Sequence, residues 1–239
     1  MIVKLLILQL LAHLVSDFYL QTEKSCKSKA DNAFKSRHLY YHVLITFACA
    51  WLFSLTVGYW WVALSIAVLH LVIDGLKSIF KNVKGAFFID QLLHLAVIVA
   101  AVVNYNRISA VSFPTWLPET KVLLWIVAFV FCLRPANFFI QNIFKDAQIT
   151  VPTSGEENQS LPNAGHVIGT VERMLSLVFV MLGQFEAIGF LLAAKSLLRF
   201  RETDTVKSEY VLVGTLLSFG IAILMGVAMK LVIESNVIS

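Results

Sequence analysis

The chain has 239 residues, of which 58% are hydrophobic and only 14% are charged. This composition excludes an ordinary soluble domain, and the long apolar runs exclude a β-barrel, whose strands would show short alternating patterns. The net charge of +4 does not indicate a nucleic-acid partner, because the lysine and arginine residues lie in short clusters between apolar segments rather than on one basic face.

Apolar segments long enough to cross, or nearly cross, a bilayer follow one another along the chain. They lie at about 2–20, 39–57, 59–80, 87–104, 119–141, 167–183, 185–200 and 210–234. The sequence therefore predicts an all-α integral membrane protein with about eight transmembrane helices. We expect two parts, a four-span bundle at residues 1–104 and four further spans at residues 105–239.

Basic residues gather in alternate connections between these spans. The connections after the first, third, fifth and seventh spans hold Lys24, Lys27, Lys29, Lys35, Arg37, Lys77, Lys81, Lys84, Arg134, Lys145, Arg199, Arg201 and Lys207. The other connections hold little positive charge, chiefly Arg107 and Lys121. Because positively charged loops stay in the cytoplasm, we expect both termini to lie outside it.

Four pairs of histidine or aspartate residues, each pair four residues apart, stand at the ends of the first four spans. The pairs are His13 with Asp17, His38 with His42, His70 with Asp74, and Asp90 with His94. Residues four apart on a helix share a face. The predicted topology brings all four pairs to one level near the cytoplasmic side, as a single site requires.

Imidazole and carboxylate groups together suit zinc, manganese or iron. Eight such side chains suffice for one or two divalent ions, and helical bundles build such sites from inward-facing residues without irregular backbone. One of Asp17, Asp74 and Asp90, if not bound to metal, would serve as a general base in hydrolysis. Gln21 and Gln91 are candidates to orient the ligands.

The same cluster also fits a proton or cation relay, or structural hydrogen bonds between helices. The outer halves of the first four spans are almost entirely apolar, so the sequence shows no polar path across the membrane, and this favours an enzyme. Lys77, one turn after Asp74, either neutralises that carboxylate, holds an anionic substrate, or only marks the cytoplasmic side.

A second group of polar residues lies in the C-terminal spans. Its members are His166, Glu172, Arg173, Lys195, Arg199 and Glu209. We expect Glu172 and Arg173 to form ion pairs with Lys195 and Glu209; the alternative is that Glu172, Arg173, Lys195 and Arg199 bind an anionic headgroup or substrate. The hydrophilic segment 146–165 is predicted to be a cytoplasmic loop or lid.

The motifs of the N-terminal half carry a resemblance. These motifs are His13-Leu-Val-Ser-Asp17-Phe-Tyr-Leu-Gln21, His38, His42, His70-Leu-Val-Ile-Asp74-Gly-Leu-Lys77 and Asp90-Gln-Leu-Leu-His94. They resemble the motifs of the bacterial membrane family catalogued as domain of unknown function 3307. The resemblance covers about residues 1–104, and residues 165–173 and 193–199 look like the C-terminal part of longer members. It implies a bacterial inner-membrane protein. The short His-x-x-x-His and His-x-x-x-Asp elements are also similar to those of inner-membrane metal-dependent hydrolases.

These features predict a membrane-embedded metal-binding protein that hydrolyses a lipid-linked or amphiphilic phosphoester or ester at the cytoplasmic face. Its expected partners are membrane lipids and this lipid-like substrate. Two alternatives come from other classes: a cation- or proton-coupled transporter or channel that uses the same cluster, and a structural or signalling membrane protein.

Overall fold

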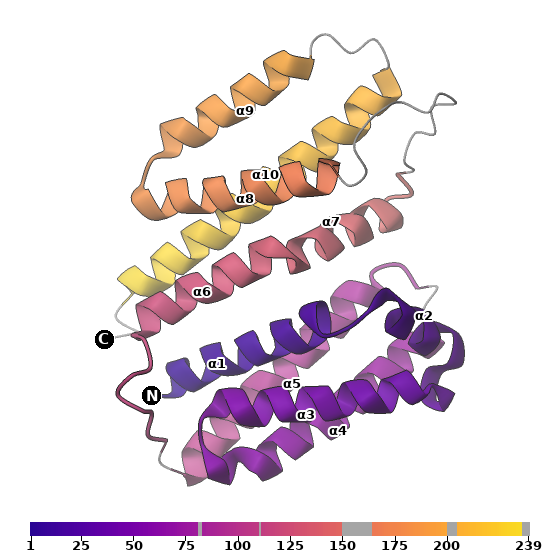
Figure 1. Cartoon of the computed structure of the whole chain (residues 1–239), viewed down its shortest axis with the longest axis vertical. Coiled ribbons are helices and arrows are strands. Elements are labelled where there is room, and N and C mark those ends of the chain that lie inside the picture. Colours follow the sequence, from indigo (N-terminus) through magenta and orange to yellow (C-terminus); the bar gives the residue numbers. More distant parts are fainter. Residues whose placement is uncertain (81–82, 110, 150–163, 200–204, 236–239) are drawn as a thin grey trace. The chain divides into compact units, whose positions relative to one another are not determined.

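The computed structural model describes residues 1–80, 83–109, 111–149, 164–199 and 205–235 (Figure 1). All regular elements in these ranges are helices, so the prediction of an all-α chain is confirmed. The chain divides into two compact units, Met1–Val127 and Ala128–Ser239. The division into functional parts at residues 1–104 and 105–239 stays a prediction.

Five helical segments are long and apolar enough to cross a membrane. They are Ile2–Tyr19, Val57–Ile79, Ala86–Ile108, Gly165–Leu182 and Ser208–Glu234. The pair Thr120–Leu133 and Pro135–Asp146 would be a sixth span, bent by 47° at its break. The predicted count of eight spans is not confirmed, since the helices at Arg37–Ser54 and Phe185–Arg199 do not meet the same requirement.

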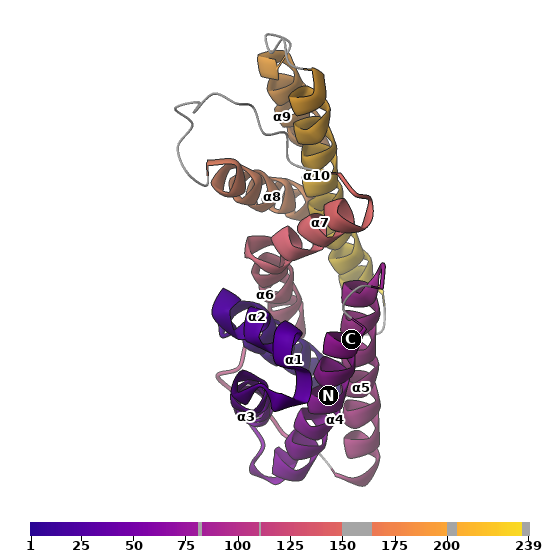
Figure 2. The ribbon, with the colours of Figure 1, turned by 90° about the vertical axis from the view of Figure 1, so that its right-hand side faces the viewer.

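Four long helices of the first unit contact one another in a ring. These helices are α1 (Ile2–Leu14), α3 (Arg37–Ser54), α4 (Trp60–Ile79) and α5 (Ala86–Ile108). Helix α1 packs against α3 and α5, while α4 packs against both α3 and α5 (Figures 1 and 2). The shorter α2 (Glu23–Asn32) lies against α3 and α4. It begins at Thr22, whose side chain accepts a hydrogen bond from Ser25 N, a common N-cap.

The interior of this unit is apolar at one end and polar at the other. Its hydrophobic core contains Leu5, Ala50, Tyr59, Val62, Ala63, Ile66, Ile98, Val102, Tyr105 and Val111. Most of these residues come from the start of α1, the end of α3, the start of α4 and the end of α5, while Tyr59 directly precedes α4 and Val111 follows α5. The histidine and aspartate pairs lie at the opposite ends of the same four helices.

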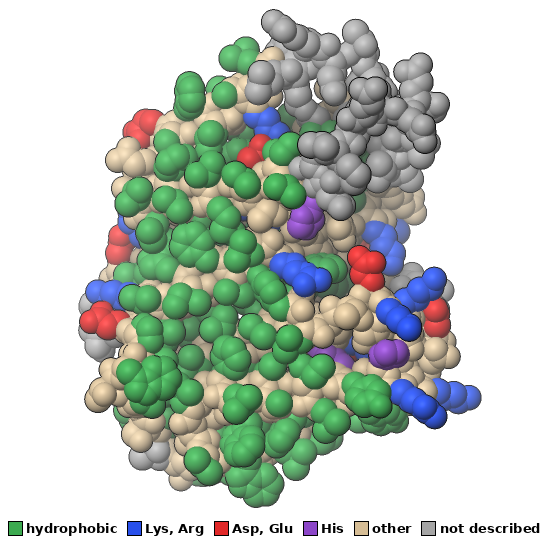
Figure 3. Space-filling view, in the orientation of Figure 1, with side chains coloured by type: hydrophobic (Ala, Val, Ile, Leu, Met, Phe, Trp, Pro, Cys, Tyr) green, Lys and Arg blue, Asp and Glu red, His purple; other side chains and the backbone are tan. Residues whose placement is uncertain are grey.

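The outward faces of the helices are hydrophobic. Leu44 of α3, Leu64 of α4 and Leu92 of α5 are each about half to two-thirds exposed, at 64%, 48% and 65%. In each unit, the face seen in Figure 3 is covered mostly by hydrophobic side chains, and charged side chains gather mainly toward the helix ends. Apolar exposure on this scale is expected of helices that face lipid.

The second unit contains the end of α6 (Thr120–Leu133), and α7 (Pro135–Asp146), α8 (Ala164–Leu182), α9 (Phe185–Arg199) and α10 (Thr205–Glu234). Helix α10 packs against α7 and α8, and α8 packs against α9. Helix α7 begins at Pro135, a residue that suits the first helical turn because it lacks an N–H. Most of the predicted loop or lid at 146–165 lies outside the described residues.

Gly226 of α10 lets α8 approach closely. A Cβ atom at this position would lie 2.8 Å from Cγ1 and 2.9 Å from Cβ of Val180. We expect Gly226→Ala to destabilise the protein by about 1–3 kcal/mol, because small residues at such contacts allow close helix packing. Gly220→Ala on the same helix is the control, since a Cβ there meets no atom within 4 Å. Thermal unfolding in detergent measures both variants, and equal midpoints would contradict the close α8–α10 contact.

Candidate metal centre

Seven of the eight predicted ligands meet at the polar end of the first unit. They form three overlapping groups, His13 with Asp17 and His70, His42 with His70 and Asp74, and Asp74 with Asp90 and His94. Within each group the ligand atoms lie within 4.8 Å of one another. Helices α1, α3, α4 and α5 and the segment after α1 contribute to the cluster. Most of these side chains are at most 5% exposed, and those of His13 and Asp17 are 10% exposed.

Asp17 reaches the cluster from a π-helix, not from a regular α-helix. Residues Val15–Tyr19 form this π-helix, and Leu20 N donates to Val15 O at 3.0 Å. The expectation that regular helices alone would build the site is therefore wrong at this point. Short π-helical segments are frequent at functional sites. Ser16 Oγ lies 2.9 Å from Asp17 Oδ1 and orients that carboxylate.

Four ligand atoms of this cluster lie close together. His42 Nε2 lies 2.9 Å from His70 Nε2, and Asp17 Oδ1 lies 3.4 Å and 3.6 Å from these two nitrogens. Asp74 Oδ2 lies 3.8 Å from each of them. A zinc ion with ligand bonds of about 2.0–2.1 Å separates its ligand atoms by about 3.3–3.4 Å. The distances from the two nitrogens to each carboxylate oxygen are near that separation, so His42 and His70 could hold a divalent ion together with Asp17 or Asp74.

The other oxygen of Asp74 faces a second set of ligand atoms. His94 Nε2 lies 3.5 Å from Asp74 Oδ1 and 3.4 Å from Asp90 Oδ1. Within the described part of the chain, His94 Nε2 and Asp90 Oδ1 are buried without a hydrogen-bond partner. The two atoms nevertheless contact each other as an ion pair, and a bound cation could take the place of the proton between them.

Two lysine side chains pair with the carboxylates of the cluster. Lys29 Nζ of α2 donates to Asp74 Oδ2 at 2.5 Å, and Lys77 Nζ donates to Asp90 Oδ2 at 2.6 Å. Of the three alternatives for Lys77, neutralisation of Asp74 does not hold, because Lys29 pairs with Asp74 and Lys77 pairs with Asp90. Lys29 was not among the predicted site residues, because the basic residues of this segment were used only to orient the spans.

The cluster has an excess of negative charge when its histidines are neutral. Its three carboxylates belong to Asp17, Asp74 and Asp90, and its two ammonium groups to Lys29 and Lys77, so that the formal sum is −1. A net negative charge in a buried site favours a bound cation. A cation at Asp74 Oδ2 would have to displace or share the ammonium group of Lys29.

His38 is the one predicted ligand that does not join these groups. It is half-buried in the first turn of α3, about 6 Å along the helix axis from His42. Gln91 has the predicted orienting position, since it accepts from His13 Nε2 at 3.3 Å and donates to Asp90 Oδ2 at 3.1 Å. Gln21 instead accepts from Cys26 Sγ at 3.0 Å.

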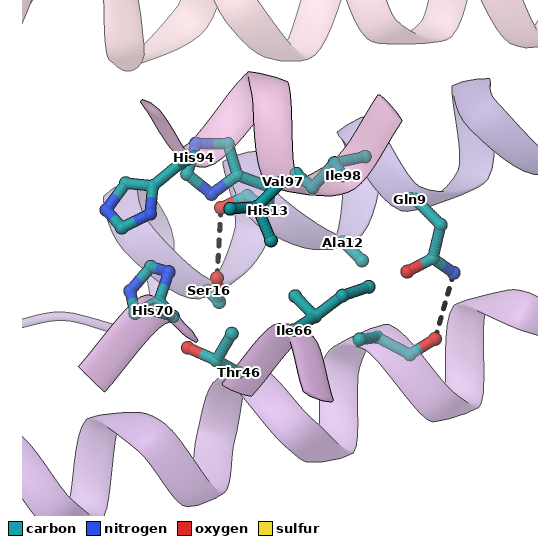
Figure 4. A pocket seen from close by; sticks show the side chains of 11 residues that line it. Gln9, Ala12, His13, Ser16, Thr46, Ile66, His70, His94, Val97 and Ile98 are labelled. Atoms are coloured by element: carbon teal, nitrogen blue, oxygen red, sulfur yellow. Dashed lines mark hydrogen bonds between the residues drawn. The ribbon is translucent and has the colours of Figure 1, made fainter. Parts of the chain in front are cut away.

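A small cavity lies beside the histidines (Figure 4). The rings of His13, His70 and His94 gather at one end of it, and Ile66 and Ile98 lie further along. Its volume of about 10 Å³ is near the lower limit for one water molecule. The cavity therefore has no room for an organic substrate, which would have to approach the cluster from outside the bundle.

The predicted residues of the second unit form a separate polar group. Lys195 Nζ donates to Glu172 Oε2 at 2.5 Å, which confirms that ion pair. The predicted ion pair of Arg173 with Glu209 is wrong: no carboxylate pairs with Arg173 within the described ranges, and its bonds go to neutral oxygen atoms. The side chain of Arg199 lies outside the described residues.

Comparison with known proteins gives one match. A family model described as "Protein of unknown function (DUF3307)" matches residues 5–124, half of the chain. The match contains all four histidine and aspartate pairs and extends beyond the residues 1–104 expected from the motifs. No curated protein and no solved structure matches the chain. The similarity to metal-dependent hydrolases is not shown by these comparisons.

We predict that the ion pair of Lys29 with Asp74 stabilises the folded state of the first unit. Lys29→Met and Asp74→Asn should each destabilise the protein by about 3–5 kcal/mol, because each leaves a buried charge without its partner. The double variant should lose clearly less than the sum. Denaturant unfolding of the four proteins in detergent gives the coupling energy, with Lys27→Met, exposed on the same helix, as the control. Additive losses would show that the two charges do not depend on each other.

Proposed function

We propose that this chain, which belongs to the DUF3307 family, is a membrane-embedded metalloprotein and a metal-dependent hydrolase. The observation that carries the proposal is the close approach of His42 Nε2 and His70 Nε2 to each other, at 2.9 Å, and to Asp17 Oδ1 and Asp74 Oδ2, at 3.4–3.8 Å. Zinc, manganese and iron are the ions whose ligand preferences match imidazole with carboxylate.

The two oxygens of Asp74 support a site for two ions. Oδ2 faces the nitrogens of His42 and His70, whereas Oδ1 faces His94 Nε2, which is also close to Asp90. A carboxylate shared in this way is a common bridge in sites that hold two ions about 3.5–4 Å apart. We therefore propose that one ion binds to His42, His70 and the carboxylates beside them, and that a second ion binds to His94 and Asp90.

A bound divalent ion supplies a Lewis acid and lowers the pKa of a water molecule. The protein's own contribution is to orient the ligands and to hold the proton. Asp17 accepts from Ser16, and Asp90 accepts from Gln91 and Lys77, so both carboxylates have fixed directions. Among Asp17, Asp74 and Asp90, an oxygen that does not bind metal is the proposed general base.

The substrate that we propose is a lipid-linked or amphiphilic phosphoester or ester. Its support is the position of the cluster at the polar end of helices whose outward faces are apolar. Lys77 is 35% exposed while its partner Asp90 is 2% exposed, so its ammonium group borders the cluster on the accessible side and suits an anionic substrate. The proposed setting is a bacterial inner membrane with eight spans and both termini outside the cytoplasm.

A second candidate function is a cation- or proton-coupled transporter or channel. The buried pairs of Lys29 with Asp74 and Lys77 with Asp90 favour it, because ionisable networks within helical bundles relay protons and cations. The hydrophobic core at the other end of the bundle weighs against it, because that core leaves no polar path beyond the cluster. The hydrolase is therefore the first proposal.

The metal content of the purified protein is the first test. Wild-type protein should hold one or two divalent ions per chain after gentle purification, measured by elemental analysis. His70→Ala and Asp74→Asn should lose most of this metal, since these residues belong to more than one of the ligand groups. His38→Ala, which changes a histidine outside these groups, should retain it. Wild-type protein that holds no metal and binds none on titration would refute the proposed site.

Hydrolysis is the second test, made on metal-loaded protein. Phosphoester and ester substrates with a long acyl chain should be turned over, and Asp90→Asn should lower kcat by about 100-fold or more because it removes a candidate base and ligand. Lys27→Met is the control for a charge change outside the cluster. Cation flux into proteoliposomes without any turnover would reject the hydrolase in favour of the transporter.

A further inference from the structure

The second unit contains a cavity that is independent of the candidate metal centre and of the function proposed for it. Its volume is about 320 Å³, within the lower range of small-molecule sites. Residues of α7, α8, α9 and α10 line it, among them Asn137, Arg173, Lys195, Thr215 and Ser218.

Arg173 brings to this cavity a positive charge that no carboxylate of the described residues pairs with. Its side chain is among the most deeply buried of the protein, and the residue is 1% exposed. Its guanidinium donates to Cys132 O at 2.8 Å, Ser218 Oγ at 3.0 Å, Asn137 Oδ1 at 2.7 Å and Thr170 Oγ1 at 3.0 Å. All four acceptors are neutral. A buried cation with only neutral partners is costly unless an anion compensates it.

A structural role accounts for part of this arrangement. Arg173 Nε donates to Cys132 O, in the last turn of α6, where the helix bends into α7 and carbonyl groups lose their helical partners. A guanidinium has five N–H groups, and the four bonds use four of them. One N–H of Nη1 therefore has no acceptor among the described residues.

The surroundings keep Asn137 and Arg173 in fixed positions. The amide nitrogen of Asn137 lies 2.9 Å from His166 Nε2, and since an amide nitrogen only donates, the imidazole accepts this bond. The amide oxygen is thereby turned toward Arg173. The guanidinium is held in place by hydrogen bonds to residues of three other helices.

Two further observations at the same cavity point to an anionic ligand. Thr215 is 5% exposed and lines the cavity, yet its Oγ1 has no hydrogen-bond partner within the described ranges. Lys195 and Glu172 neutralise each other, so that the charge of Arg173 leaves the lining with a net charge of +1 when His166 is neutral. A hydroxyl donor and an unpaired guanidinium are the groups that bind phosphate oxygens.

We propose that this cavity is a binding site for a phosphate group, either that of a lipid headgroup or free phosphate. Arg173 would contribute its remaining Nη1 N–H and its charge, and Thr215 its hydroxyl. Lys195 lies at the same cavity and would share its ammonium group between Glu172 and the ligand. No residue of the first unit takes part.

The test uses full-length protein purified in an uncharged detergent. Inorganic phosphate is titrated by calorimetry, and in a separate arm the protein is reconstituted in phosphatidylcholine vesicles with or without phosphatidic acid and its retained lipid is measured. Thr215→Val is the main variant because it removes the hydroxyl and keeps the volume, and it should weaken binding about tenfold. Arg173→Gln should abolish binding. Lys145→Gln, which removes an exposed charge outside the cavity, should have no effect.

Binding of inorganic phosphate would identify a soluble ligand, and selective retention of phosphatidic acid would identify a lipid. Thermal unfolding controls for folding, and if Arg173→Gln does not fold, Thr215→Val decides. Wild-type protein that binds neither probe, or a folded Thr215→Val protein that binds as tightly as wild type, would overturn the proposal. The metal content plays no part in this test, so the metal centre and the phosphate site succeed or fail separately.

Discussion

The first unit depends on how the buried carboxylate of Asp74 is compensated. Asp74 is 5% exposed, so bulk solvent does little to stabilise its charge. Lys29, His42, His70 and His94 surround it from α2, α3, α4 and α5, at 2.5 Å, 3.8 Å, 3.8 Å and 3.5 Å. The charge of Asp74 is thus stabilised only while these four helices keep their arrangement. The stability of the buried carboxylate and the packing of the helices therefore depend on each other.

This requirement explains why the bundle is divided into a polar and an apolar end. Tyr59 and Tyr105 pack edge to face at 4.9 Å in the apolar core, whereas the histidine and aspartate side chains gather at the other end. His13, His70 and His94 line the cavity of about 10 Å³ there. The buried histidine and aspartate groups at this end could hold a metal ion.

The two units bury charge in opposite ways. In the first, carboxylates exceed ammonium groups, and two ligand atoms, His94 Nε2 and Asp90 Oδ1, face each other without a hydrogen bond. In the second, the guanidinium of Arg173 has only neutral acceptors within the described residues, and Thr215 Oγ1 has no partner beside it. Among the described residues, each unit has an imbalance of formal charge when its histidines are neutral, negative in the first and positive in the second, and this imbalance is the common basis of both proposals.

The sequence by itself determined that the chain is all-helical with long apolar helices, and it predicted seven of the side chains that meet in the cluster, because apolar runs and spacing within one turn are local properties. It did not determine that Val15–Tyr19 would be a π-helix or that His38 would stay outside the cluster. Lys29 meets Asp74 across 45 residues of sequence, and this contact exists only because α2 lies against α3 and α4. Spacing fixes which side chains share a face of one helix, but only packing between helices decides which charges meet.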